Sequence, residues 1–169
     1  AYAKVSSYWD DVRATLYAPF ESGQLATASD VHSHEIPGGQ YTNMLFQATQ
    51  NGLAEQWPAV KKAYAEANDL LGDIVKVTPS SKTCGDLAQF MVTNGLDEKA
   101  VRQQADTLSF PGSVVEYFQG AIGIPHGGFP QPLGSQVVKN LPVFAGRPGA
   151  ELPPLDLDAA MADLQSKYG

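Results

Sequence analysis

Hydroxyl and amine side chains gather in the stretch TPSSK at residues 78–82, between an apolar run and an amphipathic segment. Their order predicts a helix start, with Thr78 as N-cap and Pro79 in the first turn. Lys82 is unusual there, because the first turn of a helix is already partly positive and usually prefers acidic residues. Free N–H groups, Ser81 and Lys82 could together hold an anion or a polarised oxygen, or Lys82 could simply extend into solvent. The residues alone leave both interpretations open.

The histidines and the cysteine give weaker chemical signals. His32 and His34 form a His-x-His pair, which can contribute two ligands to a metal. Glu35, the nearest third ligand, is adjacent in sequence and poorly placed to complete a site, so we expect the pair to lie in a loop and to bind no metal. We expect His126, in IPHGGFP, to be a turn residue. Cys84 has apolar neighbours and is expected to pack in the interior rather than act as a nucleophile.

Gln40 follows a Pro-Gly-Gly sequence at the start of a predicted helix. The glycine pair either gives flexibility to the cap or lets the backbone approach a ligand closely. The sequence holds no Gly-x-Ser-x-Gly nucleophile motif, no Walker phosphate loop and no Cys-x-x-Cys pair. Without these motifs, the residues predict a helical domain whose one unusual feature is the helix N-terminus at residues 78–82.

Composition restricts the class of protein. The 169 residues are 43% hydrophobic and 17% charged, which is typical of one globular domain. The net charge of −7 disfavours nucleic acid and anionic membranes as partners, because both attract dense Lys and Arg. No apolar run is long enough to span a bilayer. The single cysteine cannot form an internal disulfide, which suits a reducing, intracellular compartment.

Apolar residues recur with helical spacing nearly throughout, so the expected fold class is all-α. The predicted helices cover residues 4–18, 36–52, 58–72, 78–95, 97–108, 111–123 and 155–169. The run IVKV at 74–77 is prone to form a strand, but we expect a connection because no second strand pattern could pair with it. Proline and glycine between residues 125 and 154 predict an extended connector around one short helix, which wraps a neighbour rather than forming a core.

Four long blocks carry a resemblance to a known family. They are EIPGGQYTNMLFQA (35–48), VKKAYAEANDLLGDIVKVTPSSKTCGDLAQFMVTNGL (60–96), LSFPGSVVEYFQGAIGIPHGGFPQP (108–132) and GRPGAELPPLDL (146–157). Together they resemble the C-terminal helical part of the carboxyltransferase domain in the pyruvate carboxylase family, and the linker beyond it. Related biotin-dependent decarboxylases and transcarboxylases share parts of the IPGG and TPSS blocks, but the Pro-rich tail favours the pyruvate carboxylases.

The resemblance implies a domain organisation. The chain would be a helical funnel that caps a TIM barrel absent from this chain. Residues 1–18 would be a closing helix of the barrel, 19–124 the funnel, and 125–169 a Pro/Gly-rich linker with a C-terminal helix.

The resemblance also implies roles for individual residues. Thr78 matches the threonine that shuttles a proton between pyruvate and biotin, and Ser81 and Lys82 match residues that line the pocket for the biotin ureido ring. We assign Gln40 to the mouth of the same pocket. The family's metal ligands and its pyruvate-binding arginine belong to the barrel, and His32 and His34 do not correspond to them. Biotin on a carrier domain, a divalent metal (Zn or Mn) and ATP with Mg would therefore be bound in other parts of the parent protein.

The implied function is that of a ligase, which carboxylates pyruvate to oxaloacetate with ATP, bicarbonate and biotin in gluconeogenesis and anaplerosis. Expected partners are the barrel, the biotin carrier domain, pyruvate or oxaloacetate, and further copies in a homotetramer; the isolated chain is expected to be inactive. The location would be the mitochondrial matrix in a eukaryote and the cytoplasm in a bacterium. Two alternatives stay open: a subunit of a split oxaloacetate decarboxylase or transcarboxylase, and a non-catalytic helical interaction module.

Overall fold

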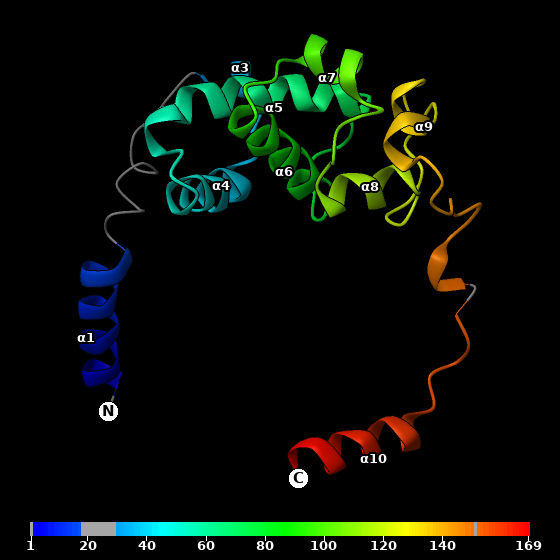
Figure 1. Cartoon of the computed structure of the whole chain (residues 1–169). Helices are drawn as coiled ribbons and strands as arrows, with labels where there is room; N and C mark the ends of the chain where they lie inside the picture. The colour runs from blue at the N-terminus through cyan, green and yellow to red at the C-terminus, as the bar shows by residue number, and fades with distance from the viewer. Residues whose placement is uncertain (1, 18–29, 151) are drawn as a thin grey trace.

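The computed structural model describes residues 2–17, 30–150 and 152–169, and within these ranges all regular structure is helical, as predicted (Figure 1). The elements in chain order are α1 (Tyr2–Val12), η1 (Arg13–Tyr17), α3 (Val31–His34), α4 (Gly38–Gln50), η2 (Ala54–Gln56), α5 (Trp57–Leu71), α6 (Ser80–Thr93), α7 (Glu98–Gln104), α8 (Gly112–Phe118), α9 (Leu133–Val138), η3 (Pro148–Ala150) and α10 (Leu157–Tyr168). Residues 74–77 form a connection rather than a strand, which confirms that expectation. Pro19, where the first helix was expected to stop, lies outside the described residues.

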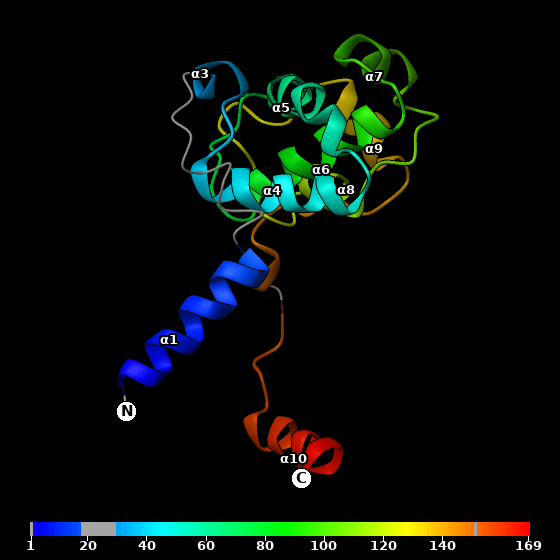
Figure 2. The same cartoon turned by 90° about the vertical axis from the view of Figure 1, so that its left-hand side faces the viewer.

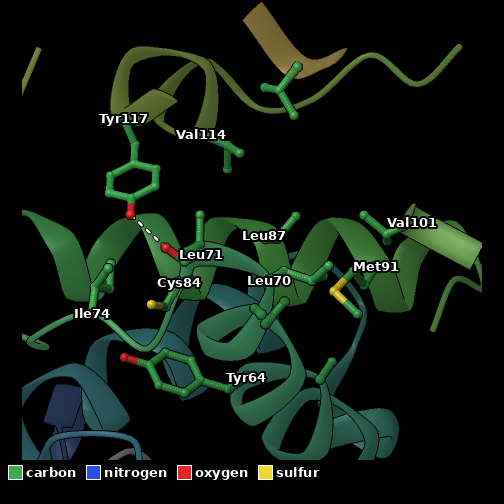
Figure 3. Close-up of a cluster of buried hydrophobic side chains, with 14 of the residues drawn as sticks. Tyr64, Leu70, Leu71, Ile74, Cys84, Leu87, Met91, Val101, Val114 and Tyr117 are labelled. Atoms are coloured by element: carbon green, nitrogen blue, oxygen red, sulfur yellow. Dashed lines mark hydrogen bonds between the residues drawn. The ribbon is translucent and has the colours of Figure 1, made fainter. Parts of the chain in front are cut away.

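Helices α5 and α6 form the centre of the packed body, and α4, α7 and α8 lie around them (Figure 1). Their facing sides are apolar at helical spacing, so both helices bury a continuous stripe. Figure 3 shows this core, in which Leu70 and Leu71 of α5 lie close to Leu87 of α6. Local signals set the bounds of α5, since Pro58 lies in its first turn and Gly72 closes it with a φ of 94° that favours glycine.

Helix α9 corrects one sequence-based expectation. Residues 125–154 were expected to contribute no core, but Leu133, Val137 and Val138 of α9 are buried. The Phe129 ring also lies edge-on to Tyr117 of α8, with 5.1 Å between the ring centroids. The expectation failed because Leu133 and Val137, four residues apart, share one face of the helix with Val138 beside them, and this is enough to bury that side of a short helix even between prolines.

Helices α1 and α10 extend away from the packed body on the same side of it (Figures 1 and 2). The N-terminal segment carries the apolar stripe that its spacing predicts, α10 also has apolar residues along one side, and these side chains are exposed in the structure. They are Val5, Tyr8, Trp9 and Leu16 near the N-terminus, and Leu157, Met161, Leu164 and Tyr168 near the C-terminus. No helix in the described part of the chain is both long enough and apolar enough to cross a membrane.

Candidate functional site

The start of α6 differs by one or two residues from the prediction. The helix begins at Ser80 with Pro79 as N-cap, so the prediction that Thr78 caps it is wrong. The reason is Ser80, whose Oγ lies 2.6 Å from the carbonyl oxygens of Val75 and Val77 and accepts the N–H of Val77 at 3.1 Å. This hydroxyl fixes the turn that leads into the helix, and Thr78 is not needed for that purpose.

Thr78 is exposed, and the Thr78–Pro79 peptide bond is cis. Its hydroxyl makes no hydrogen bond to any residue in the described ranges. A hydroxyl is both a donor and an acceptor, so this group is free to exchange a proton with a ligand.

Three backbone N–H groups at the start of α6 are not free, contrary to one interpretation of the sequence. Ser81 N–H donates to the Val77 carbonyl at 3.1 Å, and the N–H groups of Lys82 and Thr83 donate to the Pro79 carbonyl at 3.0 and 3.3 Å. These bonds close the turn internally, so these N–H groups do not form an anion cradle. A ligand site at this end of α6 would therefore have to use mainly side chains.

Lys82 does not simply extend into solvent. Its ammonium pairs with the carboxylate of Asp86, one turn further along α6. Oδ2 of Asp86 also accepts a hydrogen bond from Ser113 Oγ of α8, at 2.5 Å. Sequence reasoning missed both partners: Asp86 carried the detectable signal of i,i+4 spacing, whereas Ser113 comes from a separate helix.

Gln40 lies on the same side of α6 as Ser81, because α4 crosses α6 at a glycine. A Cβ on Gly85 would lie 2.8 Å from Gln40 Nε2 and 3.0 Å from Met44 Sδ, so glycine permits this close approach. Gly85 is one turn beyond Ser81, and successive helical residues turn by about 100°, so Ser81 and Gly85 share a face with Lys82 beside them. The structure thus brings Gln40, Ser81 and Lys82 to one part of α6, and a glycine inside a helix was the signal for it.

A hollow of about 280 Å³ adjoins this segment, between the start of α6 and the loop after α8. It is lined by residues 72–75, Ser80, Tyr117 and residues 122–126. Val75 and Ile124, which line it, are exposed apolar side chains, and Val77 next to Thr78 is exposed as well. His126 lies in a turn, as expected, closed by the Gly128 N–H donating to the Pro125 carbonyl at 3.0 Å. The hollow beside the start of α6 is therefore lined mainly by apolar groups, and Asp73, Ser80 and His126 are polar residues in its lining.

The His-x-His pair lies in a short helix, α3, rather than in the expected loop. His34 is buried and its Nδ1 accepts the N–H of Ile36 at 2.9 Å, while its Nε2 lies 3.7 Å from Asp30 Oδ1. Burial holds the pKa of His34 below its ordinary value and so favours the neutral ring. The described residues contain no group of three His, Cys, Asp or Glu side chains arranged to hold a metal ion.

Cys84 is fully buried, as expected (Figure 3). Its Sγ lies 3.9 Å from Asn68 Oδ1. Burial raises the pKa of its thiol to about 12. Because the thiolate is the nucleophilic form, a thiol with this pKa is inert near neutral pH.

Residues 31–169 match the family model of the conserved carboxylase domain. The chain belongs to this family. It is 57% identical over 166 residues to human mitochondrial pyruvate carboxylase, an alignment that covers 97% of the chain and 14% of that protein. The resemblance drawn from the four sequence blocks is thereby confirmed.

Solved structures agree with the assignment to the conserved carboxylase domain. The carboxyl transferase domain of Rhizobium etli pyruvate carboxylase is 44% identical, with a TM-score of 0.84 over 98% of this chain and 28% of that one. The same domain with pyruvate and biocytin is 42% identical, with a TM-score of 0.82. The chain thus spans a small part of each relative that it matches.

Proposed function

We propose that this chain is part of the carboxyltransferase domain of a pyruvate carboxylase, which forms oxaloacetate from pyruvate, bicarbonate and ATP through biotin. The observation that carries the proposal is the exposed Thr78 hydroxyl, which has no hydrogen-bond partner among the described residues and precedes Ser81 and Lys82 by three and four residues. Relatives that align with almost the whole chain are pyruvate carboxylases, and one similar structure holds pyruvate and biocytin.

Thr78 would act as the proton relay. Forming oxaloacetate requires a proton to leave the methyl group of pyruvate and another to reach the ureido nitrogen. The Thr78 hydroxyl can accept the first while giving up its own, so it remains neutral throughout. Its position outside the helix supports this role, because no capping bond has to break first.

Ser81, Lys82 and Gln40 would form the biotin pocket. Biotin, when bound, supplies the carboxyl group that is transferred. The Ser81 hydroxyl and the Lys82 ammonium are donors that can hold the ureido oxygen, and the ammonium also stabilises negative charge as it develops on the reacting groups. The Gln40 amide lies beside Gly85, one turn away, and can donate at the edge of the same pocket.

The exposed apolar surfaces suit a larger domain. The Rhizobium etli carboxyl transferase domain is several times longer than the part matched by this chain. We propose that a TIM barrel elsewhere in the parent protein covers the apolar stripe of α1. Residues 1–18 would then be a closing helix of that barrel and residues 19–124 the helical funnel. Residues 125–169 would be the Pro/Gly-rich linker with the C-terminal helix. By resemblance to the family, we also propose that the Zn or Mn site and the ATP site lie in other parts of the parent protein. We also propose that the parent protein forms a homotetramer. Its location would be the mitochondrial matrix in a eukaryote and the cytoplasm in a bacterium.

One alternative function has a specific observation in its favour. The exposed stripes of α1 and α10 suit a helical interaction module that docks another protein. A split-subunit decarboxylase or transcarboxylase would use the same Thr78 chemistry. The pyruvate carboxylase proposal explains the stripes and the Thr78 site together, and so we prefer it.

The substitution Thr78→Ala tests the proposal in the complete enzyme. We expect carboxyl transfer to pyruvate to fall by about 10²- to 10⁴-fold, the usual contribution of a proton-transfer group. ATP-dependent carboxylation of biotin, measured separately as bicarbonate-dependent ATP cleavage, should stay unchanged.

Thr93→Ala, an exposed threonine at the other end of α6, is the matched control and should leave both reactions intact. Equal loss of both half-reactions in Thr78→Ala would show a structural role and contradict the proposal. The 169-residue chain alone should not turn over oxaloacetate, and turnover would contradict the placement of the remaining site residues elsewhere.

A further inference from the structure

Lys82 is held by an acceptor that the proposed function does not use. Its ammonium pairs with Asp86, which lies four residues toward the C-terminus of α6. The ammonium is therefore drawn along the helix, away from Thr78, which precedes the first turn. A ligand that reaches the Thr78 hydroxyl and also needs the Lys82 charge must compete with Asp86 for it.

The ion pair between Lys82 and Asp86 is weak. An i,i+4 pair with the basic residue nearer the N-terminus is the weaker orientation, and Lys82 lies in the first turn of α6, where the helix dipole disfavours a positive charge. The Lys82 side chain is 58% exposed, so water already screens its charge. The interaction is thus weak enough for a ligand to displace it.

Ser113 lowers the free-energy cost of separating Lys82 from Asp86. Asp86 is only 21% exposed, and a partly buried carboxylate that lost its single partner would be destabilised. Ser113 Oγ of α8 donates to the same Oδ2 at 2.5 Å. This bond comes from a separate helix and does not involve Lys82, so it can remain when Lys82 leaves. The carboxylate therefore keeps one hydrogen bond in both states.

We propose that Asp86 is a positioning residue that holds Lys82 in the unliganded enzyme, and that the biotin ureido group, or the carboxylate on it, displaces Asp86 to reach the ammonium. This inference rests on the proposed function, since it takes biotin as the ligand of Lys82. Asp86 then sets the affinity for biotin without touching it.

The test measures the KM for free biotin in oxaloacetate decarboxylation by the complete enzyme. Asp86→Asn removes the competitor, so we expect the KM to fall about two- to threefold, the size of a weak i,i+4 pair, with kcat little changed. Asp86→Glu keeps the charge and should restore the original KM. Ser113→Ala should raise the KM, because the carboxylate would then lose its last partner when Lys82 leaves.

Lys62 and Glu66 of α5 provide a matched control. They form an i,i+4 pair in the same order, with exposures of 78% and 22%, and Glu66 Oε2 accepts a second hydrogen bond from the Glu98 N–H at 3.3 Å. Glu66→Gln should leave the KM for biotin unchanged. Because KM does not depend on the fraction of enzyme that is folded, a destabilised variant still reports on the inference.

The possible failures are distinguishable. Lys82→Ala should raise the KM for biotin. If it does, but Asp86→Asn leaves the KM unchanged or raises it, then the inference about Asp86 is wrong. The assignment of Lys82 to the biotin pocket is kept in that case. An unchanged KM in both variants overturns the pocket assignment and the inference with it.

Discussion

Helix α6 and the connection that precedes it, the two parts of the segment 74–93, differ in how far their apolar side chains are buried. Along α6, Cys84, Leu87 and Met91 are buried in the core (Figure 3). In the connection before it, Val75 is 81% and Val77 is 61% exposed. The buried face holds the helix in place, whereas the connection leaves apolar groups and the Thr78 hydroxyl open. Rigid support next to an open segment is the arrangement that a ligand site requires.

The largest effect on stability should come from the buried face. Leu87→Ala would leave a cavity between α6 and its neighbours, and we expect a loss of about 2–5 kcal/mol in the free energy of unfolding. Urea unfolding of the 169-residue chain, followed by circular dichroism, would measure this loss.

Leu157→Ala on α10 is the control, because its side chain is exposed and should contribute about 0.5 kcal/mol or less. Similar losses in the two variants would mean that the α6 face is not the stabilising core, and the contrast between core and connection would fail.

An intermediate effect is expected from Tyr117, which joins the packed body to the turn before the connection. Its O–H donates to the Leu71 carbonyl at 2.6 Å, shown as the dashed line in Figure 3. Tyr117→Phe would leave this buried carbonyl without its partner, and thermal unfolding should show a loss of about 1–3 kcal/mol.

Tyr64→Phe is the matched change, since the Tyr64 O–H lies 3.5 Å from the Ser81 carbonyl and makes a weaker bond. A greater loss in Tyr64→Phe than in Tyr117→Phe would contradict the assignment of the stronger link to Tyr117.

Much of the fold could be predicted because its signals are local. Pro58 and Gly72 bound α5, and Asp156 caps α10 by accepting the Ala159 N–H at 3.0 Å. The cap of α6 could not be predicted, because the Ser80 hydroxyl binds carbonyls of a turn whose shape depends on tertiary packing. The burial of α9 was missed for a similar reason, since composition alone does not show which short helix meets a neighbouring apolar face.

The candidate site shows the same limit. Thr78, Ser81 and Lys82 were identified from one short motif, and their neighbourhood in sequence guaranteed that they would be close. Ser113 is 27 residues from Asp86, and no local pattern indicates that α8 places its hydroxyl on that carboxylate. Resemblance to a family suggested roles for Thr78, Ser81 and Lys82. The structure added the contacts around Lys82, namely its ion pair with Asp86 and the hydrogen bond from Ser113 to that carboxylate.

The smallest stability effect is expected in the exposed connection. Val77→Thr keeps the β-branched shape, and the Val77 N–H still donates to Ser80 Oγ, so the free energy of unfolding should change by no more than about 0.5 kcal/mol. Val60→Thr is the matched control, because Val60 of α5 is fully buried and a hydroxyl there should cost about 1–3 kcal/mol. If the rest of the domain covers the connection, Val77→Thr should still slow carboxyl transfer several-fold in the complete enzyme. Equal destabilisation of the isolated chain by both changes would show that Val77 belongs to the core together with its buried neighbour Ile74, and the distinction between the two parts of the segment would be lost.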